Sequence, residues 1–560
     1  MKQLIECVPN FSEGNNLATI KEITSAIESV EGIKLLDVDP GKATNRTVVT
    51  FVGEPKAVVE AAFRGIARAA ELIDMTSHKG EHPRMGATDV CPFIPVSNIT
   101  LEDTAAWSKK LAERVGNELH IPVYLYEEAQ PDKLRSNLSI IRSGEYEGFA
   151  EKIKLPEWKP DFGPDRLPPK HGATVIGARD FLIAYNVNIN SKSVKRANSI
   201  AFDIREAGRI KKDEQGNKVM DANGNEIRIP GTLKGVKAIG WYIEEYGIAQ
   251  VSINITQFKE TPLHKVFDEC AESAYKRGYR VTGSELVGLV PLSAMLDAGK
   301  YFLEKQKLSS GVSNSELIHI AVKSMGLDEL APFDPKKKII EYVMQDGITL
   351  PLIGMTLERF ADETASESPA PGGGSISAYC GALGAALGAM VANLSASKSG
   401  WEDRWKEFSD WAAKGQELKN QLLHLVNEDT AAFNGIMNAF KLPKNTDEER
   451  KARTQAIQAA TKYATLIPYQ TMNAALQCFP LLKHVAANGN QNSVSDAGVG
   501  ALCARAAVMG AVLNVKINAA TLKDETFKQE MFTKATEAEK QVAILEGEIL
   551  AMVNNAIAKG

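Results

Sequence analysis

The sequence changes its character between residues 330 and 355, and this change constrains the fold more than any other feature. Before it, short β-branched and aromatic runs alternate with segments whose apolar residues recur at helical spacing. From about Met355 onward the chain is alanine-rich, and strand-like alternation is nearly absent. The sequence therefore predicts α/β sandwich units followed by an all-helical bundle.

The first α/β unit is predicted from four strands and two helices. The strands are expected at 34–38, 47–52, 90–96 and 122–126, and the helices at 18–30 and 56–73. A proline-rich stretch at 155–172 then excludes a regular helix or central strand. Beyond it, a second unit begins at 174–189, with further strand candidates at 250–255 and 279–281.

These patterns predict units at 1–180 and 181–330, a linker at 331–354 and a helical domain at 355–560. The polar segment Lys211–Gly231 is predicted to be an exposed hairpin or loop excursion, because it contains Asn-Gly twice. Helices separated by Pro or Gly breaks are expected to start at Leu357, Ser375, Trp401, Glu448, Tyr469, Asp496 and Glu525.

Composition excludes several classes of function. A net charge of -5 gives no electrostatic case for binding nucleic acid. The six cysteines form no C-x-x-C and are expected to be buried thiols in a reducing compartment. The N-terminus shows no secretory pattern, so a cytoplasmic location is expected.

The apolar run Tyr379–Ala392 is shorter than the roughly 20 residues of a membrane span. It is predicted to be a core helix in which Gly384 and Gly388 allow close helix packing.

The densest polar cluster of the first unit runs from His78 to Pro95. Its start matches H-x-x-E-H, a zinc-peptidase pattern that works only on a helix. Gly80 and Pro83 oppose a helix there, so no metal site is expected. Alternatively, His82 is an acid–base group in a loop beside Arg84. An incidental loop histidine fits the pattern equally well.

Two further polar clusters follow predicted strands, where side chains often line sites. They contain Asn10, Asp39 and Arg46. We expect both clusters to face the same place as the histidine cluster. Asp39 can orient a histidine, stabilise the positive charge of a histidine, or cap a turn. Spacing alone favours the role of a turn cap.

In the helical part, Gly372–Ser375 opens a helix whose N–H groups can receive an anion. The loop lacks the G-K-[ST] of a nucleotide-binding loop, and it fits a flexible entry to a packed helix equally well. Asp429 lies four residues before Phe433, which places it toward the side of the helix that packs against its neighbours. Burying a carboxylate there costs free energy, so this acid is expected to have a function. Asp496 is interpreted as a helix N-cap first and a catalytic acid second.

Together these segments resemble the bifunctional family of glutamate formimidoyltransferases joined to formimidoyltetrahydrofolate cyclodeaminases. For the transferase they are VPNFSEG, DVDPGKATNRTVVTFVG, LIDMTSHKGEHPRMGATDVCPFIP, PVYLYEEA, GATVIGARDFLIAYNVN and SELVGLVPLSAMLDA. For the cyclodeaminase they are APGGGSISA, LVNEDTAAF, KLPKNTDEE and NVKINAATLKDE. The resemblance covers essentially the whole chain, in the order of the two-activity enzyme.

The resemblance implies two ferredoxin-like subdomains with folate between them, followed by a helical cyclodeaminase. It implies transfer of a formimino group from N-formimino-L-glutamate to tetrahydrofolate. The product, 5-formiminotetrahydrofolate, is then cyclised to 5,10-methenyltetrahydrofolate with release of ammonia, in histidine degradation and one-carbon metabolism. Tetrahydrofolate is the co-substrate, no metal or nucleotide is expected, and a homo-oligomer is implied.

By resemblance, His82 is the transferase acid–base residue, Asp39 its acidic partner and Asp429 the cyclodeaminase proton donor. The implied folate-binding residues are Gly163, Pro164, Asp165, Arg166, Leu167, Pro168, Pro169, Lys170, His171 and Gly172. Further candidates without definite roles are Asn10, Arg46, Arg84, Gly372, Gly373, Gly374, Ser375 and Asp496. Basic stretches at Lys192–Arg196 and Arg205–Lys212 can hold a polyglutamate tail, although a solvated helix face is the simpler interpretation.

Three alternatives remain open on sequence alone. The chain can be a folate-binding scaffold without activity, or an enzyme with only one live activity. A zinc hydrolase would need metal in the purified protein.

Overall fold

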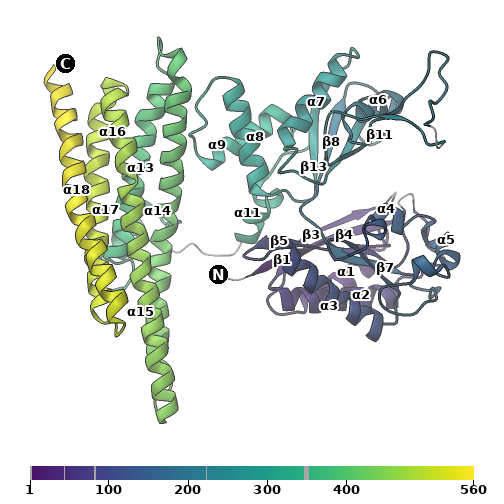
Figure 1. Ribbon diagram of the computed structural model, residues 1–560, viewed down its shortest axis with the longest axis horizontal. Helices are drawn as coiled ribbons and strands as arrows, with labels where there is room; N and C mark the ends of the chain where they lie inside the picture. Colours follow the sequence, from purple (N-terminus) through teal and green to yellow (C-terminus); the bar gives the residue numbers. More distant parts are fainter. Residues whose placement is uncertain (1–2, 43, 81–82, 222–223, 346–351, 560) are drawn as a thin grey trace. The chain divides into compact units, whose positions relative to one another are not determined.

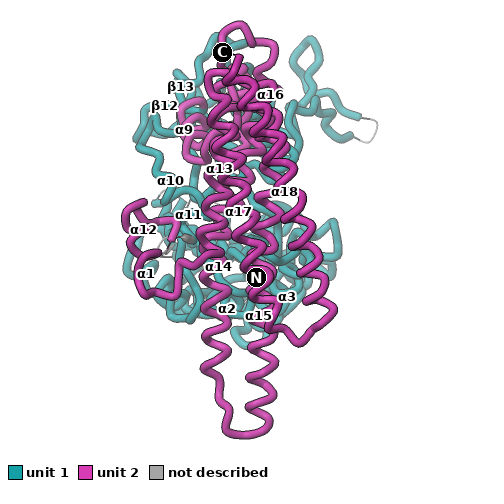
Figure 2. The backbone as a smooth tube through the Cα atoms, turned by 90° about the vertical axis from the view of Figure 1, so that its left-hand side faces the viewer, with its two compact units in different colours: residues 1–295, 325–346 teal, residues 296–324, 347–560 magenta. Residues whose placement is uncertain are grey.

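The structure is a computed structural model that describes residues 3–42, 44–80, 83–221, 224–345 and 352–559. It divides into two compact units (Figures 1 and 2). Unit 1 comprises residues 1–295 and 325–346, and unit 2 comprises residues 296–324 and 347–560. Unit 1 contains the sheets and unit 2 is helical, which confirms the predicted succession of α/β and all-helical parts.

Helices cover one face of the first sheet of unit 1. On the other face, α4 (Leu138–Ile141) and α5 (Glu145–Lys152) pack against one end of the sheet, and the remainder, which borders a cavity, is called the open face. The strands of this sheet are β1 (Leu4–Cys7), β2 (Asn10–Phe11), β3 (Lys34–Gly41), β4 (Arg46–Gly53), β5 (Thr88–Ser97), β6 (Val123–Glu127) and β7 (Thr174–Ala178). β1 and β2 both lie between β4 and β5, and β7 and β6 extend the sheet in parallel beyond β5. The covering helices are α1 (Leu17–Glu28), α2 (Pro55–Leu72) and α3 (Leu101–Glu118) (Figure 1).

A bulge in β3 decides which side chains reach the open face. The pairing of β3 with β4 shifts by one residue after Leu35, so that Asp37 pairs with Thr50 and Asp39 with Val48. Alternation along an unbroken strand would place both aspartates on the same face as Leu35, which packs against the helix-side core. The extra residue reverses this alternation and turns both carboxylates to the open face.

The second sheet of unit 1 has the order β11-β12-β8-β13 and is antiparallel throughout. Its elements, in chain order, are β8 (Ile183–Ile189), α6 (Val194–Ile204), β11 (Val236–Ile243), β12 (Ile248–Ile255), α7 (Leu263–Tyr275) and β13 (Val281–Val287). The excursion Lys211–Gly231 is a hairpin, as predicted: β9 (Arg209–Ile210) pairs with β10 (Arg228–Ile229) at its base. Residues 222–223 at one of its turns lie outside the described residues.

The region predicted as a linker contains α10 (Pro335–Lys338) and α11 (Ile340–Gln345). Both belong to unit 1, where the Lys34 ammonium group donates to the Val343 carbonyl at 2.6 Å. Conversely, residues 296–324 are grouped with the helical unit, and the Ser310 N–H donates to the Ser409 hydroxyl at 3.0 Å. The predicted domain boundaries stay predictions.

Unit 2 is a bundle around α13. Its helices after residue 352 are α12 (Leu357–Ala365), α13 (Gly373–Ala396), α14 (Trp405–Phe440), α15 (Asp447–Leu476), α16 (Cys478–Asn488), α17 (Val494–Ala520) and α18 (Glu525–Lys559). A Cβ atom at Gly384 would lie 2.8 Å from the Gly500 carbonyl oxygen, which confirms the predicted close packing. In Figure 2, α14 and α15 continue as a hairpin past the end of the other helices.

Two of the described helices, Gly373–Ala396 and Gln491–Ala520, are long and apolar enough to cross a membrane. Within them, 61% and 50% of the most apolar window is buried inside the protein. Core helices of a bundle meet the same length and composition criteria, and here the buried residues are mainly alanine and glycine that pack against neighbouring helices.

The predicted break before Tyr469 is wrong, because α15 continues through Pro468. Proline has no N–H to donate to the carbonyl four residues earlier, which is that of Ala464. The Asn518 amide of α17 donates to this carbonyl at 2.8 Å. A tertiary hydrogen bond thus replaces the lost helical one, and the helix is not interrupted.

Candidate active sites

A cavity of about 830 Å³ lies on the open face of the first sheet and extends to the second sheet of unit 1. Three of the predicted site residues, Asn10, Asp39 and Arg46, line it together. Lys237 and Asn254 of the second sheet form part of its other wall. Its volume is in the range of small-molecule sites.

The three polar clusters of the first unit meet at Asn45, as the sequence predicted. The Asn45 side-chain oxygen accepts from the Gly14 N–H at 3.0 Å, and its amide donates to the Lys79 carbonyl at 2.8 Å. Its backbone oxygen lies 2.9 Å from Nε2 of His78. Asn45 has a φ of 48°, a left-handed conformation that asparagine tolerates better than most residues.

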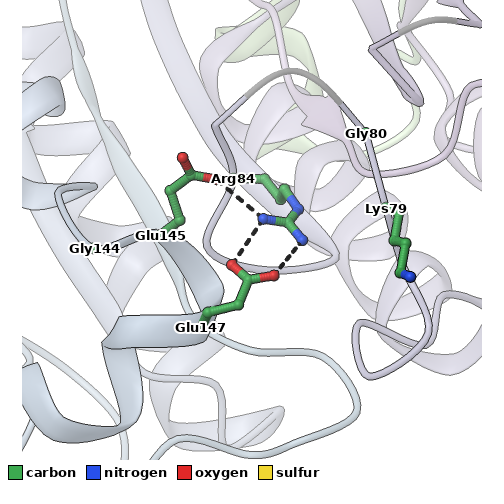
Figure 3. A pocket seen from close by; sticks show the side chains of 6 residues that line it. All are labelled: Lys79, Gly80, Arg84, Gly144, Glu145 and Glu147. Atoms are coloured by element: carbon green, nitrogen blue, oxygen red, sulfur yellow. Dashed lines mark hydrogen bonds and ion pairs between the residues drawn. The ribbon is translucent and has the colours of Figure 1, made fainter.

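Arg84 ties the histidine loop to α5 (Glu145–Lys152) beside a smaller cavity of about 580 Å³ (Figure 3). Its guanidinium donates to Glu147 at 2.7 Å and to Glu145 at 3.1 Å, while its Nε donates to Nδ1 of His78 at 3.2 Å. The hydrogen bond to Glu147, offset in part by burial, raises the pKa of Arg84. Arg84 therefore serves as a structural tie in this arrangement.

Glu81 and His82 lie outside the described residues, so the proposed acid–base role of His82 and the H-x-x-E-H pattern stay predictions. Among the residues that the structure does describe, no group of three or more His, Cys, Asp or Glu side chains could hold a metal ion.

The predicted folate segment Gly163–Gly172 precedes β7 and is not part of either cavity lining described above. Its backbone is held by hydrogen bonds: the Lys170 carbonyl accepts from the Met75 N–H, and the His171 carbonyl accepts from the Ala87 N–H. Gly163 has a φ of 84°, and a Cβ there would lie 2.3 Å from the Ile121 carbonyl oxygen. Its role in folate binding stays a prediction.

Sequence reasoning missed several acidic residues of the larger cavity, among them Glu6 and Asp37. Glu6 is only 4% exposed, and burial raises its pKa to about 7, although nearby Arg179 lowers it. Burial, and then repulsion from Asp39, raises the pKa of Asp37. A charged residue inside the alternating apolar run LIECV was the signal that could have identified Glu6.

The raised pKa of Glu6 predicts a pH-dependent stability. The folded protein holds this proton more tightly than the unfolded chain, so the free energy of unfolding falls as pH rises from about 4.5 to about 7. A shift of this size corresponds to roughly 3 kcal/mol. We expect Glu6→Gln to remove most of this loss, as measured by urea denaturation at pH 5 and pH 8. Exposed Glu102→Gln is the control, and an unchanged pH dependence in Glu6→Gln would contradict the prediction.

In unit 2, Asp429 lies against the N-terminus of α13 and there contacts two other predicted residues, Gly374 and Ser375. The Ser375 hydroxyl donates to its carboxylate at 3.0 Å, and a Cβ at Gly374 would lie 2.1 Å from Oδ1 of Asp429. Burial raises the pKa of Asp429, and hydrogen bonds from Ser375 lower it in part. A carboxyl that keeps its proton more readily than usual is suited to act as an acid.

Asn514 of α17 lies at the same end of the bundle and was missed by sequence reasoning. A Cβ at Gly373 would lie 3.4 Å from its amide nitrogen. Asp496 lies elsewhere: α17 runs antiparallel to α13, with Gly510 beside Ser377 and Gly500 beside Gly384, so Asp496 is toward the opposite end. Its predicted N-cap role is wrong, since Ser493 is the N-cap and Asp496 lies in the first turn.

The contact between Gly374 and Asp429 predicts that Gly374→Ala reduces the cyclodeamination that the family resemblance implies. The added methyl group must displace the carboxylate, at a cost of about 1–3 kcal/mol in stability. The matched control is Gly435→Ala in α14, where nothing lies within 4 Å of an added Cβ. We expect the control to retain activity and to gain roughly 0.5–1 kcal/mol from helix propensity. Equal activities of the two variants, with ammonia release as the measurement, would contradict the assigned position of Asp429.

Comparison with known proteins finds matches over nearly the whole chain. Residues 4–179 match the family described as formiminotransferase domain, N-terminal subdomain. Residues 184–345 match the formiminotransferase domain family, and residues 356–537 match the formiminotransferase-cyclodeaminase family.

Individual relatives agree with these matches. The formimidoyltransferase-cyclodeaminase of Mus musculus is 44% identical over 98% of this chain and 99% of its own length. A glutamate formimidoyltransferase of Streptococcus pyogenes is 40% identical over 54% of this chain and 94% of its own. A methenyltetrahydrofolate cyclohydrolase of Methylorubrum extorquens is 41% identical over 31% of this chain and 84% of its own. Because the likeness to a two-part relative extends through both units, the chain belongs to the formimidoyltransferase-cyclodeaminase family.

Proposed function

We propose that this protein transfers the formimino group of N-formimino-L-glutamate to tetrahydrofolate and then converts 5-formiminotetrahydrofolate to 5,10-methenyltetrahydrofolate and ammonia. The observation that carries this proposal is the 44% identity to a two-activity relative over 98% of the chain. The larger cavity of unit 1 and the acid at the N-terminus of α13 supply a separate candidate site for each step.

For the first step, N5 of tetrahydrofolate attacks the formimino carbon and a tetrahedral intermediate forms. N5 must lose a proton and the glutamate nitrogen must gain one before the carbon–nitrogen bond breaks. We assign both transfers to His82, since an imidazole exchanges protons readily near neutral pH. Asp39, which lines the cavity, stabilises the imidazolium that forms between the two transfers.

For the second step, N10 attacks the formimino carbon and its proton passes to the imino nitrogen. The bond between the carbon and this nitrogen then breaks, and ammonia leaves. Ammonia is a poor leaving group unless its nitrogen is protonated, so the step needs an acid. We assign this role to Asp429, because its raised pKa keeps a larger share of the carboxyl protonated near neutral pH than an exposed aspartate would. Ser375 fixes the orientation of the carboxyl by donating to its Oδ2.

The test is incubation of the purified protein with formiminoglutamate and tetrahydrofolate. We expect 5,10-methenyltetrahydrofolate, followed by its absorbance, and ammonia to appear in equal amounts. Accumulation of 5-formiminotetrahydrofolate without ammonia would leave only the transferase. Folate binding without turnover would favour the scaffold alternative, and a protein inert toward both substrates would contradict the proposal.

We further infer that each half of the transferase is a ferredoxin-like subdomain. The order β11-β12-β8-β13 and the βαββαβ succession of the second sheet support this, and β3-β4-β1-β5 repeats the pattern in the first. We also propose a cytoplasmic homo-oligomer that uses folate polyglutamates and takes part in histidine degradation. Fractionation of cells and light scattering of the purified protein test location and assembly.

A further inference from the structure

Two arginines share one buried carboxylate in the wall of the larger cavity. Asp89 is 0% exposed, and its Oδ2 lies 2.7 Å from Nη2 of Arg142 and 3.6 Å from Nη2 of Arg46. Its Oδ1 accepts from the Met85 N–H at 3.2 Å. The group therefore carries one more positive than negative charge, in a place where solvent neutralises charge poorly.

Both guanidinium groups belong to the cavity lining and retain only slight exposure, 13% for the side chain of Arg46 and 12% for that of Arg142. Arg46 also donates to the side-chain oxygen of Asn10. The buried Nε of Arg142 has no hydrogen-bond partner in the described parts of the chain. Burial, together with repulsion from Arg142, lowers the pKa of Arg46 to about 10 despite the attraction of Asp89. Acidic side chains, among them Glu6, Asp37 and Asp39, line other parts of the cavity, so an entering anion would be attracted only where it contacts the two guanidinium groups directly.

We propose that Arg46 and Arg142, held by Asp89, bind the α-carboxylate of the formimino donor. The inference rests on the proposed function and identifies a substrate-binding group within that site. Planar guanidinium groups suit a carboxylate because they form paired, charge-assisted hydrogen bonds.

The position of the group favours the donor over the folate tail as the source of the carboxylate. Asp39 pairs with Val48, and Arg46 is two residues away on the same face of β4, so the arginine lies close to Asp39, the assigned acidic partner of His82. In N-formimino-L-glutamate the α-carboxylate is joined to the formimino carbon through only one nitrogen and one carbon. In tetrahydrofolate the whole p-aminobenzoyl group separates the glutamate from the reacting nitrogen.

The first test is Arg142→Gln, with Arg114→Gln as the matched control. Arg114 pairs with Glu60 at 2.7 Å and Glu118 at 2.9 Å, outside the cavity. We expect the KM for formiminoglutamate to rise about 10- to 100-fold in Arg142→Gln, as for loss of a charged hydrogen bond. The KM for tetrahydrofolate should stay within about twofold, and Arg142→Lys should retain part of the affinity.

A second test separates this site from turnover. Calorimetry should detect glutarate, a dicarboxylate without the formimino group, binding to the wild type and not to Arg142→Gln. If the wild type binds glutarate but catalyses no transfer, the proposed function fails and the carboxylate site stands. If Arg142→Gln does not fold, as judged by circular dichroism, Arg142→Lys is measured in its place and a smaller change of the same sign is expected.

Two results would overturn the proposal. A rise in the KM for tetrahydrofolate but not for tetrahydropteroate, which lacks the glutamate, would assign the arginines to the folate tail. Unchanged KM values for both substrates in a folded Arg142→Gln or Arg142→Lys variant would show that the ion pair of Asp89 with the arginines has only a structural role.

Discussion

Replacing Asp429 with asparagine is expected to lower ammonia release by about 10²- to 10⁴-fold while leaving formimino transfer within about twofold. The amide cannot supply the proton that the departing nitrogen needs. Its similar size preserves the packing against Gly374, and its oxygen can still accept from Ser375. The measurement is cyclodeamination of preformed 5-formiminotetrahydrofolate, followed by ammonia and by absorbance.

The neighbouring acid provides a matched control for this substitution. Glu428 is on the same turn of α14 and accepts from the Tyr463 hydroxyl at 2.9 Å on an exposed face. We expect Glu428→Gln to keep both activities within about twofold, because this contact is exposed and worth little. Loss of both activities in Asp429→Asn would contradict two separate sites, and near-normal ammonia release would contradict the assignment of the acid.

Replacing His82 with alanine is expected to lower formimino transfer by about 10²- to 10⁴-fold, because proton exchange at both nitrogens then depends on water. Cyclodeamination of preformed 5-formiminotetrahydrofolate should be unaffected, since it uses Asp429. Asp39→Asn should lower transfer by a smaller factor, because it removes only the charge that stabilises the imidazolium. Initial rates of transfer and of cyclisation, measured separately, check these expectations.

His78 is the control for His82 within the same loop. Its ring lies 2.9 Å from the Asn45 carbonyl oxygen and accepts from Arg84 at 3.2 Å, so its contacts are structural. We expect His78→Gln to lower the Tm and to change kcat by less than about threefold. A folded His82→Ala variant with transfer near the wild-type rate would reject the proton-transfer role of His82.

Local patterns in the sequence were sufficient to locate several strands and helices, although the helix α3 was not predicted. The strand predicted at 47–52 is found at Arg46–Gly53, and the helix predicted at 56–73 is found at Pro55–Leu72. Such patterns can be recognised in the sequence because side chains return to the same face of a strand or helix every few residues. One local signal was misleading, because Pro468 predicted a helix end. The helix continues, since the side chain of the distant residue Asn518 donates to the carbonyl group that the proline leaves without a helical partner.

The sites depended on contacts between distant parts of the chain. The polar loops were visible in the sequence, but the bulge that turns Asp37 and Asp39 to the cavity arises from pairing with β4. The ion pair of Asp89 with Arg142 joins residues 53 positions apart, and no local pattern predicts that these two side chains pair. The sequence by itself determined the succession of α/β and helical parts and, through its motifs, the family. Tertiary structure alone decided which charges share a cavity, because burial and ion pairing depend on neighbours that only folding brings together.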